Sequence, residues 1–310
     1  MDWLAAIILG VVEGITEFLP VSSTGHLTVV EKLLGLTVDD PDVTAFTAIV
    51  QVGAIAAAIV YFRRDIVRLA TAWCAGLVNA ERRRTTDYRL GWAVIVGSIP
   101  IGVVGLAFES VIEGVLRSLW VVAGALIAWS AVMWLADRHA ARRAGPAAGG
   151  LVAAASPAGG GAAALAGRGT VPAGLRGEDS LTVVDGLVIG LGQCLALVPG
   201  VSRSGATISV ALFRGIDRTT ATRWSFFLGI PALTASGVLQ AVKAADDIAV
   251  GVGWAPTAVA TAVSFAVAYA SIAWLLRFVA SNRFTGFVVY RVLAGLAVAS
   301  LLAFGVVAAV

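Results

Sequence analysis

Long apolar runs separated by arginine-rich segments dominate this chain and restrict what it can fold into. Of its 310 residues, 59% are hydrophobic and 13% are charged, against roughly 25% charged residues in an ordinary soluble domain. Several runs approach the ~20 residues that a helix needs to cross a bilayer. An all-α polytopic membrane protein surrounded by membrane lipid is therefore predicted. No basic run is interleaved with aromatic residues, so nucleic acid is not an expected partner.

Six transmembrane helices are predicted, and the arginines between them set their orientation. The crossings lie at about 44–62, 90–108, 118–136, 224–242, 253–276 and 286–310. Arginines cluster in alternate connections, namely 63–89, 137–180, 214–223 and 277–285. Because loops rich in Lys and Arg remain in the cytoplasm, these four connections are predicted to be cytoplasmic and both termini to lie outside.

Two further apolar stretches are too short and too broken to span a membrane. A 13-residue helix is only ~20 Å long. The stretch at 5–36 is interrupted at Pro20, and the stretch at 186–213 is interrupted at Pro199-Gly200. Each is predicted to form a re-entrant helical hairpin, because broken backbone at membrane depth must be buried in protein or line a polar cavity.

The two hairpins resemble each other at an offset of 180 residues. This offset aligns Glu13 with Gln193 and superimposes five identities: Gly10/Gly190, Val21/Val201, Ser22/Ser202, Gly25/Gly205 and Gly35/Gly215. Because the crossing after each hairpin starts on a different side, the chain is predicted to contain two inverted-topology repeats, 1–136 and 181–310. A flexible cytoplasmic Ala/Gly-rich linker, 137–180, is expected between them. Inverted repeats with broken helices place a site near the midplane, where they meet.

Two acids and two groups of hydroxyls mark that predicted site. Glu13 and Glu17 are four residues apart and share a helix face, so these carboxylates need a cation, a proton or an arginine. Together they could hold a divalent cation such as Mg²⁺. The hydroxyls stand where the second half-helices start, at Ser22, Ser23 and Thr24 and at Ser202, Ser204 and Thr207. Helix capping is the alternative role for each of them.

Arg203 and His26 are the remaining candidates. A guanidinium at membrane depth is costly, so Arg203 is expected to face Glu13, Glu17 and an anionic ligand such as a phosphate; a purely structural Arg203–Glu17 ion pair is the alternative. His26 could relay protons or attack phosphorus. His139 is expected to be solvated, and Arg291 is expected to extend to the cytoplasmic surface rather than bind substrate.

Two long motifs carry a resemblance to a known family. The segments "EGITEFLPVSSTGH" (13–26) and "PGVSRSGAT" (199–207) resemble the signatures of the undecaprenyl-diphosphate phosphatases, the bacitracin-resistance membrane phosphatases. The resemblance covers essentially the whole chain except 144–180. It implies a bacterial cytoplasmic-membrane hydrolase that converts undecaprenyl diphosphate to undecaprenyl phosphate and inorganic phosphate, using a divalent cation (Mg²⁺ or Ca²⁺) in a site open to the periplasm. The implied site residues are Glu13, Glu17, Ser22, Ser23, Thr24, His26, Gly200, Ser202, Arg203, Ser204 and Thr207.

Several questions stay open at this point. Ser23, His26 or a water molecule could attack the terminal phosphorus, with Glu17 handling protons and Arg203 clamping the diphosphate. The same architecture also suits a transporter that moves undecaprenyl phosphate or another anionic lipid across the membrane. Self-association as a homodimer is compatible with the sequence but is not determined by it.

Overall fold

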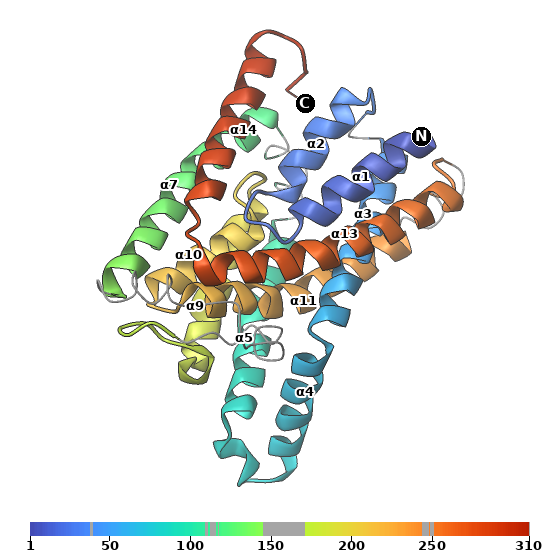
Figure 1. Cartoon of the computed structure of the whole chain (residues 1–310). Coiled ribbons are helices and arrows are strands. Elements are labelled where there is room, and N and C mark those ends of the chain that lie inside the picture. The colour runs from blue at the N-terminus through green and yellow to red at the C-terminus, as the bar shows by residue number, and fades with distance from the viewer. Residues whose placement is uncertain are drawn as a thin grey trace, which may run out of the picture.

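The computed structural model describes residues 1–37, 40–108, 111, 116, 118–144, 171–243, 248 and 251–309. The first half contains α1 (Trp3–Thr16), α2 (Ser23–Leu33), α3 (Pro41–Tyr61), α4 (Arg63–Val78), η1 (Arg82–Arg84), α5 (Thr86–Ala107) and α7 (Leu119–Arg143). The second half contains η3 (Glu178–Ser180), α9 (Val183–Gln193), η4 (Cys194–Leu197), α10 (Arg203–Phe213), α11 (Arg218–Lys243), α13 (Trp254–Ser281) and α14 (Thr285–Ala303). Figure 1 shows their arrangement.

Five of the helices in the described ranges are long and apolar enough to cross a membrane: α3, α5, α7, α13 and α14. The predicted polytopic all-α class is therefore confirmed. The sixth predicted crossing, 224–242, lies within the 26-residue helix α11. This helix starts with the polar run Arg218-Thr-Thr-Ala-Thr-Arg, and it is not among the five.

Both predicted hairpins are broken helices, and their geometries match. Helices α2 and α10 each follow a break and correspond at the offset of 180 residues. The residue before each helix is a serine with positive φ, 78° at Ser22 and 77° at Ser202. L-residues rarely adopt this conformation, and surrounding structure has to hold it. After the second half-helices, Gly35 and Gly215 have φ values of 73° and 74°.

The first half-helices pack against helices of the opposite half of the chain. α1 lies along α13, and α9 lies along α5. A Cβ atom on Gly10 of α1 would lie 2.6 Å from the carbonyl oxygen of Ala260 in α13. In the matching pair, a Cβ atom on Gly190 of α9 would collide with the backbone of Gly97 in α5. Small residues let helix backbones approach closely inside membranes, so these glycines let each first half-helix pack directly against a helix of the opposite half.

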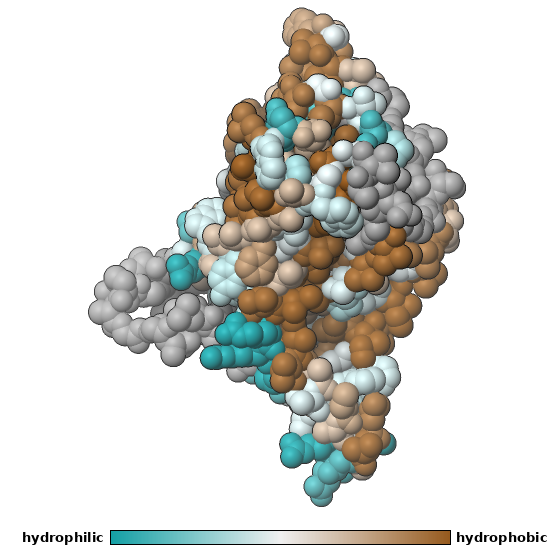
Figure 2. Space-filling model, turned by 90° about the vertical axis from the view of Figure 1, so that its right-hand side faces the viewer, coloured by the Kyte–Doolittle hydropathy of each residue, from teal (hydrophilic) through white to brown (hydrophobic). Residues whose placement is uncertain are grey.

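Arginine-rich segments gather at one end of the molecule. In Figure 1, α4 and the first turns of α5 extend away from the two termini, and Figure 2 shows hydrophilic residues at that tip below a mostly hydrophobic face. Ion pairs join the halves above this tip: Arg223 of α11 contacts Asp65 in the first turn of α4 at 3.0 Å, and Arg218 contacts Asp137 of α7 at 2.5 Å.

Two predicted boundaries need correction. Residues 137–143 of the predicted linker continue α7, and residues 171–180 pack against the second half, where Arg176 contacts Asp185 at 2.6 Å; residues 145–170 lie outside the described ranges. The last crossing ends at Ala303 rather than 310, because Gly305 takes a φ of 69° and turns the chain. The carbonyl oxygen of Ala309 then accepts a hydrogen bond from the Leu119 N–H at 2.9 Å.

Candidate active site between the two helix breaks

The two breaks bring together three of the predicted site residues. Glu17 caps the C-terminal end of α1, and its two oxygens have different partners. Oε1 is 3.3 Å from Nη2 of Arg203, and Oε2 accepts a hydrogen bond of 2.7 Å from the Ser23 hydroxyl. Both Glu17 and Arg203 are shielded from solvent. The expected contact between Arg203 and the acidic motif is therefore present, and it includes the hydroxyl of Ser23.

Helix α11 and the first break hold the Arg203 guanidinium from two other sides. Nη1 of Arg203 donates to the carbonyl oxygen of Ser225 in α11 at 3.2 Å, and the guanidinium lies 5.8 Å from the ring centre of Phe18. Thr207 does not face Glu17: its hydroxyl bonds to the Ser225 hydroxyl at 2.7 Å. Ser204 donates to the carbonyl oxygen of Leu19 at 3.0 Å, which ties the second break to the first.

Glu13 occupies a different environment from Glu17. Its side chain is 1% exposed, and both carboxylate oxygens lack a hydrogen-bond partner among the described residues. It lines a cavity of about 240 Å³ whose walls come from α1, α2, α3, α7, α11 and the second break. The lining residues are Glu13, Ser23, Thr24, Leu27, Thr28, Glu31, Thr44, Thr47, Ala48, Gln51, Val122, Pro199 and Gln240. Most of the polar members offer oxygen atoms, which are the ligands that hard cations prefer.

Glu31 and Thr47 were not expected at the site. The Thr47 hydroxyl donates to Oε1 of Glu31 at 3.0 Å, and both residues line the same cavity as Glu13. Glu31 stands on the face of α2 that also carries Ser23, Leu27 and Thr28. This helical spacing, read together with Glu13, could have identified it in the sequence.

His26 points away from Glu17 and Ser23, toward α14. Its Nδ1 lies 2.7 Å from the carbonyl oxygen of Ser22, and its Nε2 lies 2.6 Å from the hydroxyl of Tyr290. The two rings stack with centres 5.6 Å apart and planes inclined by 12°. Tyr290 was not predicted from the sequence, because nothing in its local pattern distinguishes it from an aromatic residue at a membrane surface.

Arg291 does not extend to the surface, so this expectation was wrong. Its side chain is fully buried, and Nη1 and Nη2 donate to the carbonyl oxygens of Pro20 at 3.2 Å and Gly200 at 2.8 Å. Its Nε donates to the Ser130 hydroxyl at 3.3 Å. The breaks leave carbonyl groups without helical partners, and burying such groups unbonded is costly. One guanidinium therefore satisfies a carbonyl from each break.

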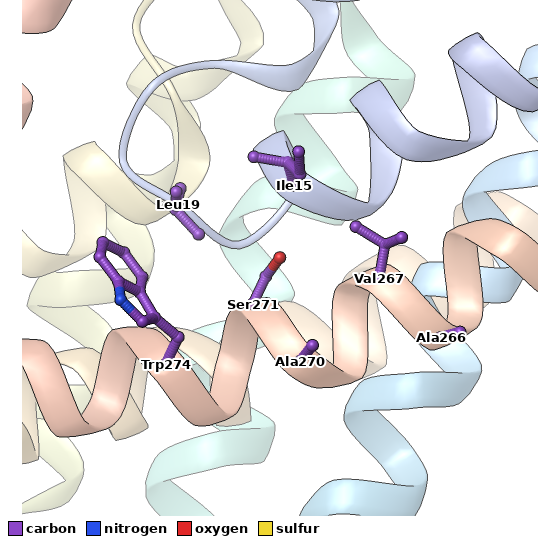
Figure 3. Close-up of a pocket in the computed structure, with 7 residues that line it drawn as sticks. All are labelled: Ile15, Leu19, Ala266, Val267, Ala270, Ser271 and Trp274. Atoms are coloured by element: carbon purple, nitrogen blue, oxygen red, sulfur yellow. The ribbon is translucent and has the colours of Figure 1, made fainter.

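A second, larger hollow lies beside the first break and has a different character. Figure 3 shows Ile15 and Leu19 facing one side of α13, where Trp274 projects toward them. The hollow has a volume of about 540 Å³, and its lining is apolar except for Ser271: Ile15, Leu19, Ala266, Val267, Ala270, Ser271 and Trp274. It contains none of the predicted site residues. The predicted site residues Glu13, Ser23 and Thr24 line the smaller polar cavity instead.

The fold and this site together define a class of protein: a multi-pass helical membrane protein in which two broken helices meet at a buried carboxylate–hydroxyl–guanidinium cluster. The chain belongs to the family of the bacitracin resistance protein BacA, whose family model matches residues 6–297. The predicted resemblance is confirmed.

Similar proteins share the chain's full length. A protein of Cutibacterium acnes named undecaprenyl-diphosphatase is 55% identical over 316 residues, covering 100% of both chains. The undecaprenyl-diphosphatase 3 of Frankia casuarinae is 52% identical over 309 residues, again covering 100% of both. A Mycobacterium sp. undecaprenyl-diphosphatase is 45% identical over 314 residues with the same coverage.

Proposed function

We propose that this chain is a membrane phosphatase that hydrolyses undecaprenyl diphosphate to undecaprenyl phosphate and inorganic phosphate. This reaction recycles the lipid carrier of cell-wall synthesis and underlies bacitracin resistance. The observation that carries the proposal is the hydrogen bond from the Ser23 hydroxyl to Glu17, directly beside Arg203. A hydroxyl, a base and a guanidinium are the groups needed to transfer a phosphoryl group to and from an enzyme.

Ser23 is our choice of nucleophile, among the three that the sequence left open. Its hydroxyl already donates to Glu17, whereas His26 is bonded to Ser22 and Tyr290. As the Ser23 oxygen bonds to the terminal phosphorus, its proton passes to Glu17, and the bond between phosphorus and the bridging oxygen breaks to release undecaprenyl phosphate. Water then hydrolyses the phosphoserine, and inorganic phosphate leaves.

Arg203 couples substrate binding to this step. In the structure, Nη2 of its guanidinium neutralises Glu17. A diphosphate bound beside Ser23, which lines the cavity, would compete for the same planar fork, because guanidinium groups bind phosphate oxygens in pairs. When Arg203 turns to the substrate, Glu17 loses its positive partner while it still accepts the hydrogen bond from the Ser23 hydroxyl. Thr24 lines the cavity and is proposed to contact phosphate directly. Ser22, Gly200, Ser202, Ser204 and Thr207 are proposed to hold the two breaks in the shape that binds phosphate.

A divalent cation, Mg²⁺ or Ca²⁺, fits the Glu13 side of the cavity. Glu13 presents a buried carboxylate without a partner among the described residues, on a wall rich in oxygen donors. Glu17, the second predicted ligand, fits less well in this state, because Arg203 and Ser23 engage its two oxygens. The bound ion would neutralise charge on the phosphate oxygens.

The topology we propose is six transmembrane helices and two re-entrant hairpins in two inverted repeats, 1–136 and 181–310. The matching geometry at Ser22 and Ser202 and the reciprocal packing of α1 on α13 and α9 on α5 support it. The arginine-rich end would face the cytoplasm. Both termini and the site would then face the outer side of the bacterial cytoplasmic membrane, where the diphosphate is presented.

The first prediction is tested by phosphate release from purified protein in detergent. With Mg²⁺ or Ca²⁺ and a polyprenyl diphosphate, we expect the wild type to release phosphate. Ser23→Ala, Glu17→Gln and Arg203→Ala should each lose at least about 100-fold in kcat/KM, the scale set by nucleophile, base and charge-stabilising groups. Thr28→Ser, which keeps a hydroxyl on the cavity wall, is the matched control and should remain active.

Trapping the phosphorylated enzyme distinguishes the nucleophiles. An acid-stable label that is absent from Ser23→Ala supports phosphoserine, whereas an acid-labile label would assign the attack to His26. No label at all would point to direct attack by water. If purified wild-type protein releases no phosphate, the enzyme proposal is wrong, and lipid flux across vesicles becomes the measurement for the transporter alternative. The paired broken helices are the observation that favours that alternative.

A further inference from the structure

The two breaks hold their strained serines in different ways. Ser202 caps its own helix: its side-chain oxygen accepts a hydrogen bond of 3.2 Å from the Gly205 N–H. Ser22 has almost the same φ, but within the described residues its side chain makes no capping hydrogen bond. A positive φ at a residue other than glycine persists only when its surroundings hold it. Ser22 therefore needs support from another group.

His26 supplies that support. Its ring Nδ1 is 2.7 Å from the Ser22 carbonyl oxygen, and its own backbone N–H donates to the same oxygen at 3.3 Å. In the second half the matching position is Ala206, whose backbone N–H alone reaches the Ser202 carbonyl oxygen, at 2.8 Å. The extra hydrogen bond thus occurs in the half where the serine does not cap its helix.

The partners of the ring determine its tautomer. A carbonyl oxygen only accepts hydrogen bonds, so Nδ1 carries the proton that it shares with Ser22. In the neutral ring, Nε2 then accepts from the hydroxyl of Tyr290, 2.6 Å away. The stacked ring of Tyr290 fixes the plane of the imidazole. The next residue, Arg291, ties α14 to both breaks, so Tyr290 is anchored relative to Ser22.

The contacts of Tyr290, His26 and Ser22 determine the position of Ser23. Ser22 and Ser23 are consecutive, so the backbone angle at Ser22 decides where the Ser23 side chain starts. Ser23 in turn donates to Glu17 rather than to His26. Neither ring nitrogen of His26 is therefore engaged with the hydroxyl that has to lose a proton.

We propose that His26 is a positioning residue, supported by Tyr290, that holds the Ser22 backbone so that the Ser23 hydroxyl points at Glu17. This inference rests on the proposed function, because it assumes that Ser23 and Glu17 carry out the reaction. It assigns no proton transfer to His26. Tyr290, which is 46% exposed, is assigned to hold the imidazole in place. It does not belong to the cluster of Glu17, Ser23 and Arg203.

Two substitutions of His26 separate positioning from proton transfer. The amide nitrogen of asparagine lies nearly where Nδ1 lies and can donate to the Ser22 carbonyl, but an amide does not titrate near neutral pH. We expect His26→Ala to lose on the order of 100-fold in kcat, as misplacement by about 1 Å does. His26→Asn should recover to within about tenfold of the wild type, because it restores the hydrogen bond that positions Ser23. The exposed His139 provides the matched control, His139→Asn, which should behave as the wild type.

Equal inactivity of His26→Asn and His26→Ala, in protein that retains its thermal transition, would overturn the proposal. That result would return His26 to the role of acid, base or nucleophile, whose loss costs about 10²–10⁴-fold. Tyr290→Phe keeps the stacked ring and removes only the hydroxyl. It should lower kcat by about three- to tenfold and leave KM unchanged, since it disturbs alignment and not binding. Tyr269→Phe is its control.

A spectroscopic measurement tests the contact without using activity. The chain contains two histidines, so ¹⁵N-histidine labelling of the His139→Asn protein leaves His26 as the single signal. We expect a protonated Nδ1 and an unprotonated, hydrogen-bonded Nε2, and a changed Nε2 shift in Tyr290→Phe. A ring protonated at Nε2 and bare at Nδ1 would overturn the proposal. A wild type that releases no phosphate would instead contradict the proposed function and leave this tautomer result standing.

Discussion

Glu13 and Glu17 share one helix face, but their carboxyl groups have different hydrogen-bond and charge partners. Glu17 gains Arg203 and the Ser23 hydroxyl, one on each oxygen. Glu13, one turn earlier, is equally buried and has no partner for either oxygen among the described residues. A buried carboxylate without a counter-charge is destabilising. We propose that a bound divalent cation supplies the partner that Glu13 lacks among the described residues.

Exchanging Glu13 for glutamine tests the proposed cation site. We expect Glu13→Gln to leave thermal stability nearly unchanged in the absence of divalent cations, because the amide has the same shape as the carboxyl group and the described residues offer neither group a hydrogen-bond partner. Mg²⁺ or Ca²⁺ should raise the Tm of the wild type, since a ligand that binds the folded state stabilises it. The same ions should not raise the Tm of Glu13→Gln. The measurement is thermal unfolding in detergent with and without each ion, and Glu81→Gln, at the arginine-rich tip, is the control.

A cation-induced increase in Tm of the same size in Glu13→Gln would contradict the placement of the ion at Glu13. Phosphatase activity measured alongside should fall in this variant even where its Tm is preserved. The two readouts together separate loss of the ion from loss of the fold.

Among the elements, the half-helices depend on close contact between backbones. α1 meets α13 at Gly10 and Gly14, and α9 meets α5 at Gly186 and Gly190. Each contact joins elements from opposite halves of the chain, so each first half-helix packs against the other half.

The apolar runs and the interrupting prolines were enough to predict these short helices. The prediction put the end of the first half-helix at Pro20, whereas α1 ends at Thr16 and residues 17–21 form a turn.

A single methyl group placed in such a contact should separate the helices. Gly10→Ala places a Cβ atom 2.6 Å from the Ala260 carbonyl oxygen, closer than atoms can pack. We expect a loss of about 1–3 kcal/mol in stability, the usual cost of overpacking. Gly102→Ala in α5, which has open space around its Cα, should be neutral or slightly stabilising because alanine favours helix. Thermal unfolding of both variants in one detergent makes the comparison, and equal stability would show that α1 and α13 do not pack as described.

At the scale of the whole molecule, α14 connects the two breaks. Tyr290 reaches His26 in the first half, and Arg291 reaches Pro20 in the first break and Gly200 in the second. Two ion pairs, Asp65 with Arg223 and Asp137 with Arg218, join the same halves near the arginine-rich end. Contacts therefore join the two halves at two places, at the helix breaks and near the arginine-rich end. The candidate site lies at the helix breaks.

Arg291→Lys tests whether the hydrogen bonds of Arg291 hold the two breaks together. An ammonium keeps the charge but lacks the planar fork, so it cannot donate to both carbonyl oxygens and to Ser130 at once. We expect a loss of about 1–3 kcal/mol, because buried carbonyl groups are left unsatisfied. Activity should also fall, since the breaks are no longer held together. Arg283→Lys, an exposed arginine before α14, is the control. A Tm equal to that of the wild type would show that the breaks are held by other contacts.

The class of fold, the positions of both broken helices and most polar residues of the candidate site could be predicted from the sequence. These features depend on local quantities, namely the length of apolar runs, the interruption by proline and the cost of charge in hydrocarbon. Which acid pairs with Arg203, which acid has no partner among the described residues, and that Tyr290 and Arg291 reach the breaks became apparent only in the folded chain. Those contacts join residues up to 271 positions apart, and hydropathy and spacing carry no information about which distant helix faces meet.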